Sequence, residues 1–313
     1  MLAYLLRRLT LVVPTIFVAL IVVFLLLRLI PGDPALMQVG DLNDLSALEE
    51  ARRNLGLDRS IPEQFLIWMG DVLRGNLGTS IKSGEPVIDM ILRSFPVTAQ
   101  VVLLATFLAS CVALPGGLLA AWRQNSRFDI AVVAFAALCL SVPGFWLALL
   151  LLTLFGVILG WLPTVGYVSI ADDPGRGLLY LIMPVLALTM NELAALTRMS
   201  RSSTIDVMRL EFVTNARAKG LPQRTVMWKH VFPNAFAPTL TVIGLLLGHL
   251  LSGVVVIETM FSLPGIGRLM VNGIFMRDYP VVQGVLLFSV FLTISINVII
   301  DLLYPVFDPR VRL

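Results

Sequence analysis

Three polar residues interrupt long apolar runs in this sequence: Asn191, Glu192 and His249. Their side chains can form hydrogen bonds, and Glu192 can carry a negative charge. Charge inside a membrane is costly, so an ionisable residue there is a candidate for a solute pathway. We therefore predict that these residues belong to a translocation pathway. For each of them, a role in packing through satisfied hydrogen bonds is the alternative.

The sequence lacks the residue patterns that usually carry catalysis. His230 and His249 are its only histidines, and neither has an evident catalytic partner. Cys111 and Cys139 lie inside apolar runs without metal-ligand spacing, so we interpret them as packing residues. No Gly-x-x-x-x-Gly-Lys loop is present to cradle nucleotide phosphates. We expect no enzyme, no metal site and no intrinsic ATPase, so a partner or an ion gradient must supply energy for transport.

A basic loop at about 198–235 carries the most informative local pattern. Ser203-x-x-Asp206 predicts the start of a helical segment. Phe212 to Lys219 predicts a short helix that Gly220 ends, because glycine adopts the left-handed cap conformation without penalty. Leu221-Pro222 then restarts the chain.

The short helix has two features that suit a docking element. Arg217 and Lys219 fall in its last turn, where cations complement the helix dipole. Ala216 and Ala218 keep it slim. We therefore predict that the groove of another protein approaches its backbone. Phe232-Pro233 closes the following segment.

The composition indicates how these residues are held. Hydrophobic residues make up 58% of the 313 residues and charged residues only 14%, where a soluble domain has about 25%. Apolar runs of about 20 residues match the length of a helix that crosses a bilayer. We predict an all-α membrane protein. Its six spans are expected at about 9–30, 98–121, 130–158, 178–197, 236–257 and 282–304.

The third span and the segment after the first span need separate interpretation. Pro143-Gly144 lies within 130–158, and we expect one kinked helix there. In 31–97, the capping boxes Ser46-x-x-Glu49 and Ser60-x-x-Glu63 predict two short helices on the membrane surface, ended by Gly56 and Gly75. A third, around Val87 to Leu92, is expected as an interfacial elbow. The predicted parts are 1–30 with the first span, a periplasmic segment at 31–97, and a five-helix core at 98–313.

Basic residues predict the orientation of the chain, since they collect in cytoplasmic loops. Most of them flank one side of the predicted spans: Arg7, Arg8, Arg123, Arg127, Arg198, Arg201, Arg209, Arg217, Lys219, Arg224, Lys229, Arg310 and Arg312. The short loops on the other side hold only Arg176, Arg268 and Arg277. Both termini and the 198–235 loop are therefore predicted to be cytoplasmic. A stripe of small residues, Gly244, Gly248 and Ser252, predicts close helix packing by the fifth span.

Motifs along nearly the whole chain resemble the permeases of binding-protein-dependent ABC importers, in the branch that transports peptides and nickel. They are Met1-Leu-Ala-Tyr-Leu-Leu-Arg-Arg8, Pro31-Gly-Asp-Pro-Ala35, Leu55-Gly-Leu-Asp58, Asn76-Leu-Gly-Thr-Ser80, Trp161-Leu-Pro-Thr-Val-Gly-Tyr167, Glu258-Thr-Met-Phe-Ser-Leu-Pro-Gly-Ile-Gly267, Arg277-Asp-Tyr-Pro280 and Asp308-Pro-Arg-Val-Arg312. In the loop, Gly220 and Pro233 keep the spacing of the family's ATPase-coupling pattern. Thr214, Asn215 and Ala216 replace its Glu-Ala-Ala, which is a departure from the general pattern.

The resemblance implies a type I ABC importer permease fold with a periplasmic segment between the first two helices. It further implies a B-type subunit in the bacterial inner membrane, paired with a second homologous permease. One or two cytoplasmic ATPases would bind ATP and Mg²⁺, and a periplasmic or lipid-anchored solute-binding protein would deliver the solute. The implied ATPase-coupling residues are Thr214, Asn215, Ala216, Arg217, Ala218, Lys219, Gly220, Leu221, Pro222 and Pro233.

Short peptides are the expected solute, and nickel, a nickel chelate or another small solute such as glutathione is the alternative. An ion-driven secondary transporter is a different class, and such folds usually show broken helices in two repeated halves. The sequence shows only one broken span. A membrane-embedded enzyme would need a catalytic set that is absent.

Overall fold

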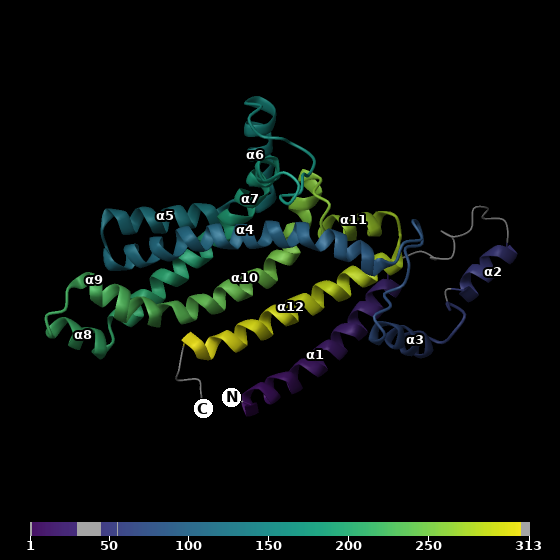
Figure 1. Ribbon diagram of the computed structural model, residues 1–313, viewed down its shortest axis with the longest axis horizontal. Helices are drawn as coiled ribbons and strands as arrows, with labels where there is room; N and C mark the ends of the chain where they lie inside the picture. Colours follow the sequence, from purple (N-terminus) through teal and green to yellow (C-terminus); the bar gives the residue numbers. More distant parts are fainter. Residues whose placement is uncertain (1, 30–44, 55, 308–313) are drawn as a thin grey trace. The chain divides into compact units, whose positions relative to one another are not determined.

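The computed structural model describes residues 2–29, 45–54 and 56–307 and is helical along most of that length (Figure 1). The first helices are α1 (Leu2–Leu29), α2 (Leu45–Asn54), α3 (Ile61–Leu73), α4 (Val87–Trp122), α5 (Arg127–Ser141) and α6 (Gly144–Leu151). A π-helical segment, η2 (Leu152–Ile158), continues α6. The remaining elements are α7 (Pro174–Met208), α8 (Glu211–Ala218), α9 (Gln223–Thr225), the π-helical η3 (Val226–Val231), α10 (Phe232–Phe261), α11 (Ile266–Phe275) and α12 (Tyr279–Phe307). The motifs at 31–35 and 308–312 lie outside the described residues, as do Arg310 and Arg312.

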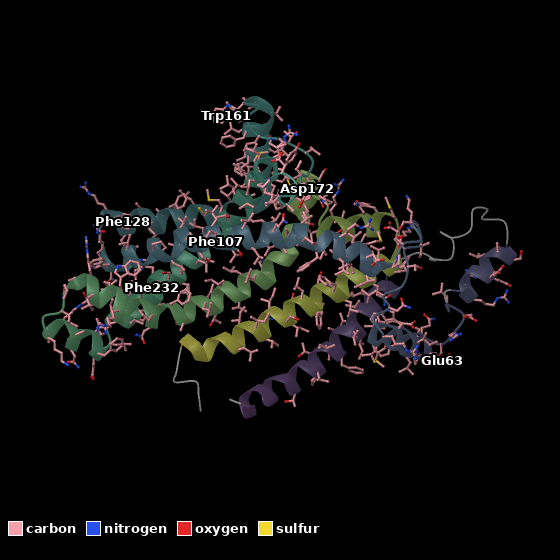
Figure 2. All side chains as sticks on the ribbon, viewed as in Figure 1. Glu63, Phe107, Phe128, Trp161, Asp172 and Phe232 are labelled. Atoms are coloured by element: carbon pink, nitrogen blue, oxygen red, sulfur yellow. The ribbon has the colours of Figure 1, made fainter. Side chains whose placement is uncertain are left out.

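The helices fit the prediction of a membrane protein. Among the described residues, four helices are long and apolar enough to cross a membrane, and six if each of two bent pairs is one span. Large apolar side chains are exposed on them, for example Phe107 of α4 (Figure 2). Phe107 is 67% exposed, which suits contact with lipid rather than water. The predicted spans 98–121, 178–197, 236–257 and 282–304 fall within α4, α7, α10 and α12.

The third predicted span differs from the expected single kinked helix. It consists of two helices, α5 and α6 with η2, which meet at an angle of 92°. Val142 and Pro143 are extended between them, with ψ of 118° and 135°. Proline lacks a backbone N–H and disfavours helical backbone in the residue before it, so the helix ends instead of bending. The prediction of one kinked helix is therefore wrong.

One compact unit comprises Thr98–Leu263 together with the chain from Ser295. Within it, α7 packs against α5, α6 and α10. A Cβ atom on Gly117 of α4 would lie 2.7 Å from the Ser200 Cβ atom of α7, so glycine is what lets these helices approach each other. Likewise, a Cβ atom on Gly244 of α10 would overlap the Ile300 side chain of α12. The predicted close packing at Gly244 is confirmed.

The second compact unit comprises Leu2–Val97 and Pro264–Ile294. Residues 264–294 thus group with the N-terminal part, whereas the sequence analysis assigns them to the five-helix core. In this unit Val87 and Ile91 of α4 pack with Ile266, Val281 and Val285 in a buried cluster. Asp278, only 5% exposed, accepts a 2.5 Å hydrogen bond from the Ser80 hydroxyl. Two of the quoted motifs are therefore joined by a buried polar contact.

Local sequence signals predict some helix ends correctly and others wrongly. The capping box at Ser60 and Glu63 is present, and Gly56 and Gly75 follow helix ends with φ of 64° and 79°, so these predictions are confirmed. Residues 87–92 form the first turns of α4 and not a separate elbow. Ser203 does not begin a helical segment, because α7 continues unbroken to Met208. A local capping signal inside a long helix is overridden when the helix buries a continuous face.

Candidate functional site

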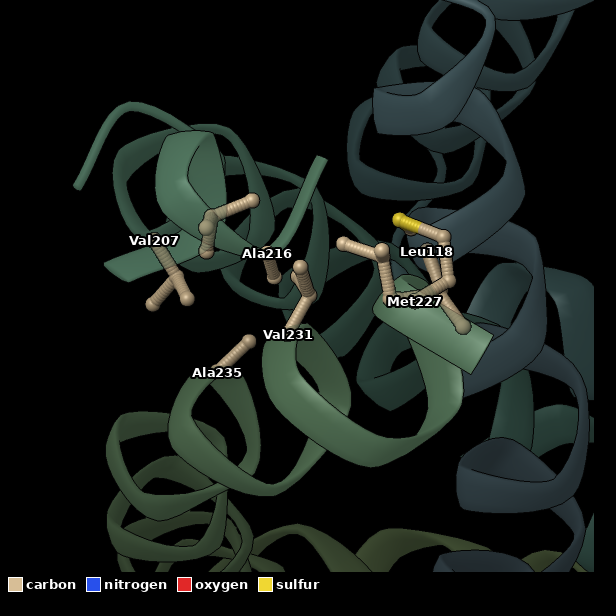
Figure 3. Close-up of a cluster of buried hydrophobic side chains, with 8 residues drawn as sticks. Leu118, Val207, Ala216, Met227, Val231 and Ala235 are labelled. Atoms are coloured by element: carbon tan, nitrogen blue, oxygen red, sulfur yellow. The ribbon is translucent and has the colours of Figure 1, made fainter. Parts of the chain in front are cut away.

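The 198–235 loop folds into short helices that pack around a buried apolar cluster. Figure 3 shows this cluster, which gathers side chains from α4, α7, α8, η3 and α10. Its members are Leu118, Val207, Val213, Ala216, Val226, Met227, Val231 and Ala235. The described cluster therefore joins α8 and η3 to α4, α7 and α10 by buried side-chain contacts.

The end of α8 forms as the sequence predicts. Gly220 has φ of +77°, a left-handed conformation that glycine adopts without penalty. Its N–H donates to the Arg217 carbonyl at 2.9 Å, and the Leu221 N–H donates to the Ala216 carbonyl at 3.4 Å. This pair of bonds is the glycine-terminated cap known as the Schellman motif. It turns the chain back toward α9 and holds the last turn of α8 in one shape.

The other side of this turn faces outward. We call the following set of exposed residues the α8 face: Thr214, Asn215, Arg217, Ala218, Lys219, Gly220, Leu221 and Pro222. It offers two cations and a small side chain, and the backbone of Gly220 has open space above it, with no atom within 4 Å of where a Cβ would lie. Such a surface can admit a partner close to the main chain.

The structure separates two of the predicted coupling residues from this face. Ala216 is only 6% exposed and belongs to the buried cluster, so it is small because the chain's own core requires it. The idea that both alanines admit a partner is therefore wrong for Ala216 and fits Ala218 alone. Pro233 is exposed, but it lies in the first turn of α10 and not beside α8.

The structure brings the three predicted pathway residues together. Asn191 and Glu192 of α7 and His249 of α10 line one cavity of about 420 Å³. Its remaining lining residues are Leu140, Gly144, Phe145, Leu188, Ala195, Leu246, Gly253, Val256 and Ile257. The cavity is thus mostly apolar with a few polar groups, and its volume falls in the range of about 300–1,000 Å³ typical of small-molecule sites.

Glu192 is the most constrained of these residues. It is 2% exposed, and its Oε1 atom lies 3.4 Å from the Thr106 hydroxyl of α4. In the described part of the chain its Oε2 atom has no hydrogen-bond partner. A buried acceptor without a partner is uncommon, because desolvation is then uncompensated. Glu192 therefore retains hydrogen-bonding capacity that the chain itself does not use.

Gly144, the first residue of α6, leaves room for Asn191. A Cβ atom on Gly144 would lie 2.7 Å from the Asn191 Nδ2 atom, so a larger residue there would push the amide aside. His249 is exposed on α10 and lines the same cavity. The sequence shows the apolar runs and the Pro143-Gly144 break. It does not show the 92° angle between α5 and α6, so it could not predict that α6 lines the same cavity as α7 and α10.

Two buried carboxylates bind residues far away in the sequence, which sequence patterns did not predict. Asp129 of α5 accepts two hydrogen bonds from the Arg201 guanidinium of α7, at 2.6 and 2.8 Å. From the sequence, Arg201 is interpreted only as one of the basic residues that mark the cytoplasmic side. Glu258 of α10, fully buried, accepts a 2.6 Å hydrogen bond from the Thr98 hydroxyl of α4. Residues 72 and 160 positions apart give no periodic signal, so only the fold reveals these pairs.

Known families match both parts of the chain. A family described as the inner membrane component of binding-protein-dependent transport systems matches residues 113–313. A companion family, the N-terminal part of such membrane components, matches residues 1–102.

Individual relatives match along the full length. The chain is 41% identical to a putative peptide transport system permease protein of Brucella abortus (strain 2308), over 100% of this chain and 99% of the relative. It is 39% identical to a glutathione transport system permease protein, GsiC, of Pectobacterium atrosepticum, with the same coverage. A chain of the MetNI methionine ABC transporter, solved in inward-facing conformations, superposes with a TM-score of 0.59 at 17% identity. That match covers 71% of this chain and 97% of the other, and it confirms the expected permease fold.

Proposed function

This chain belongs to the family of inner membrane components of binding-protein-dependent transport systems, and we propose that it is the permease subunit of an ATP-driven importer of short peptides. In this role it forms half of the pathway across the bacterial inner membrane. A second, homologous permease forms the other half, and two ATPase domains on the cytoplasmic side supply the energy. ATP and Mg²⁺ bind those partners, and an external binding protein delivers the solute.

The observation that carries this proposal is the cavity between α6, α7 and α10. It offers a few polar groups among apolar walls, which suits solutes with a common polar backbone and varied side chains. The relative from Brucella abortus, 41% identical, is named as a peptide permease and supports the same solute class.

The α8 face supports the proposed coupling to the ATPases. It is exposed and basic. The buried cluster of Figure 3 connects α8 to helices that also line the cavity. Both α7 and α10 contribute to that cluster and to the cavity. A partner that moves α8 would therefore move the cavity walls, which is what alternating access requires. We further propose that the α8 face and both termini lie in the cytoplasm, which the basic residues flanking that side of the predicted spans support.

Reconstitution tests the proposal. The chain, its companion permease and the ATPases are placed in liposomes with enclosed ATP, the binding protein outside, and radiolabelled dialanine as the probe. We expect dialanine to accumulate inside the liposomes only when ATP is enclosed and the binding protein is present outside. ATPase stimulation by the binding protein without any dialanine movement would refute a peptide as the solute.

Glutathione is the second candidate, because a relative 39% identical over the full chain is named as a glutathione permease. The same liposomes with radiolabelled glutathione distinguish the two solutes. Competition by unlabelled dialanine would show a shared pathway, and uptake of glutathione alone would replace the first proposal.

A further inference from the structure

We propose that Glu192, together with Asn191, binds the primary ammonium group of the solute as it passes through the cavity. This inference rests on the proposed function, since it requires the solute to enter this cavity. It goes further because it assigns the solute's ammonium group to Glu192 and so orients the amino end of the solute toward α7.

One carboxylate oxygen of Glu192 has no hydrogen-bond partner among the described residues. The residue is 2% exposed, and the hydrogen bond that its Oε1 atom accepts from Thr106 is long at 3.4 Å. The Oε2 atom has no partner among the described residues, although the side chain lines the cavity. A buried anion is stabilised when a cation and hydrogen-bond donors reach it. An ammonium group supplies both, because it carries a positive charge and three donors.

The charge of the cavity lining and the residue next to Glu192 both suit an ammonium group. No lysine or arginine is among its lining residues, so the chain supplies no fixed cation of that kind there. Asn191 is the adjacent residue and lines the same cavity, and its amide oxygen can accept a second hydrogen bond from an ammonium group. The absence of a side chain at Gly144 lets the Asn191 amide occupy its position.

The remaining cavity walls would accept solutes with different side chains. Leu140, Leu188, Leu246, Val256 and Ile257 are apolar and offer no hydrogen bond to a solute side chain. A site that fixes an ammonium group and otherwise presents hydrocarbon selects for the terminus that all free peptides share. Solute side chains of different size then lie against the apolar part.

Binding to the purified transporter tests this assignment. The probes are dialanine and N-acetyl-dialanine, which differ in the ammonium group. Saturation-transfer NMR measures their binding to the permease and ATPase complex without the binding protein, so that selection by the binding protein does not enter. The variants are Glu192→Gln and, as a matched control, Thr189→Val. Thr189 is also buried in α7 and bonded to backbone carbonyls, but it does not line the cavity.

The expected result is a preference of about ten-fold or more for dialanine over its acetylated form in the wild type, from charge-assisted hydrogen bonds. Glu192→Gln should remove that preference, and Thr189→Val should keep it. An unchanged preference in Glu192→Gln would overturn the assignment and leave the carboxyl as a packing partner of Thr106. Equal binding of both probes by the wild type, or no saturable binding, would overturn it as well.

The liposome experiment separates this inference from the proposed function. If wild-type liposomes transport dialanine but Glu192→Gln retains the ammonium preference, only the inference fails. If the wild type transports no peptide, the proposed function fails independently of what Glu192 binds.

Discussion

At the scale of single residues, the buried carboxylates of this chain differ in how they are satisfied. Asp129 has a guanidinium partner, Asp278 has the Ser80 hydroxyl, and Glu258 has the Thr98 hydroxyl. Each of these joins segments far apart in the sequence. Glu192 alone of these four has an oxygen without a partner in the described chain, and it alone lines the cavity. The three carboxylates that are satisfied within the fold thus differ from Glu192, which lines the cavity.

Asp129→Asn tests the first group. The Asp129 side chain is 4% exposed and Arg201 25%, so the substitution removes a largely buried bidentate ion pair between α5 and α7. We expect the free energy of unfolding to fall by roughly 1.5–3 kcal/mol, the range for hydrogen bonds to charged groups. Thermal unfolding in detergent measures it.

The control is Glu85→Gln, which removes the pair with Arg93. Those side chains are 47% and 66% exposed, so the change should stay below about 1 kcal/mol. Equal effects of both substitutions would contradict the structural role of the Asp129 and Arg201 pair.

Gly220→Ala tests the cap of α8. Its Cβ would meet no atom within 4 Å, so the cost arises only from the left-handed backbone, about 1–2 kcal/mol. Hydrogen exchange of the α8 amides should increase. Gly116→Ala is the matched control, since that glycine also has open space around it but lies inside α4. Equal protection of α8 in both variants would exclude a special role for Gly220.

At the scale of elements, α8 has a buried alanine, Ala216, and an exposed one, Ala218. Substitutions at these two positions can distinguish an effect on folding from an effect on partner binding. Ala216→Leu inserts a larger side chain into the buried cluster and should destabilise the chain by about 1–3 kcal/mol. Ala218→Leu lies on the α8 face and should leave the melting temperature unchanged while reducing co-purification with the ATPases. Normal co-purification of Ala218→Leu would remove the α8 face from the proposed ATPase interface.

The sequence predicts the elements far better than it predicts their contacts. Apolar runs locate α4, α7, α10 and α12 because a bilayer requires about 20 consecutive apolar residues. Gly220 marks the end of α8 because its cap chemistry is local. The angle at Pro143 and the burial of Ala216 depend on packing between distant segments, which no periodicity encodes. The helix α11 was not predicted, since its ten residues are too few to stand out as a span.

At the scale of the whole molecule, the proposed orientation can be measured by cysteine labelling. In a variant lacking Cys111 and Cys139, single cysteines replace Thr214 or Asp172, both exposed in the chain. A membrane-impermeant maleimide added to intact spheroplasts should label the Asp172→Cys variant at once. It should label Thr214→Cys only after the membrane is permeabilised. The reverse pattern would invert the proposed topology.

The continuity of α7 has a mechanical consequence. This helix runs without interruption from the cavity at Glu192 to the buried cluster at Val207, a distance of about 22 Å at 1.5 Å per residue. Its internal proline, Pro184, lies outside that stretch, whereas Pro238 of α10 lies between the cluster and the cavity. The α7 segment therefore has no internal proline to weaken it, whereas Pro238 removes one backbone hydrogen bond from α10. A single alanine inserted between Glu192 and Val207 would turn one end by about 100° relative to the other and should uncouple ATP hydrolysis from transport.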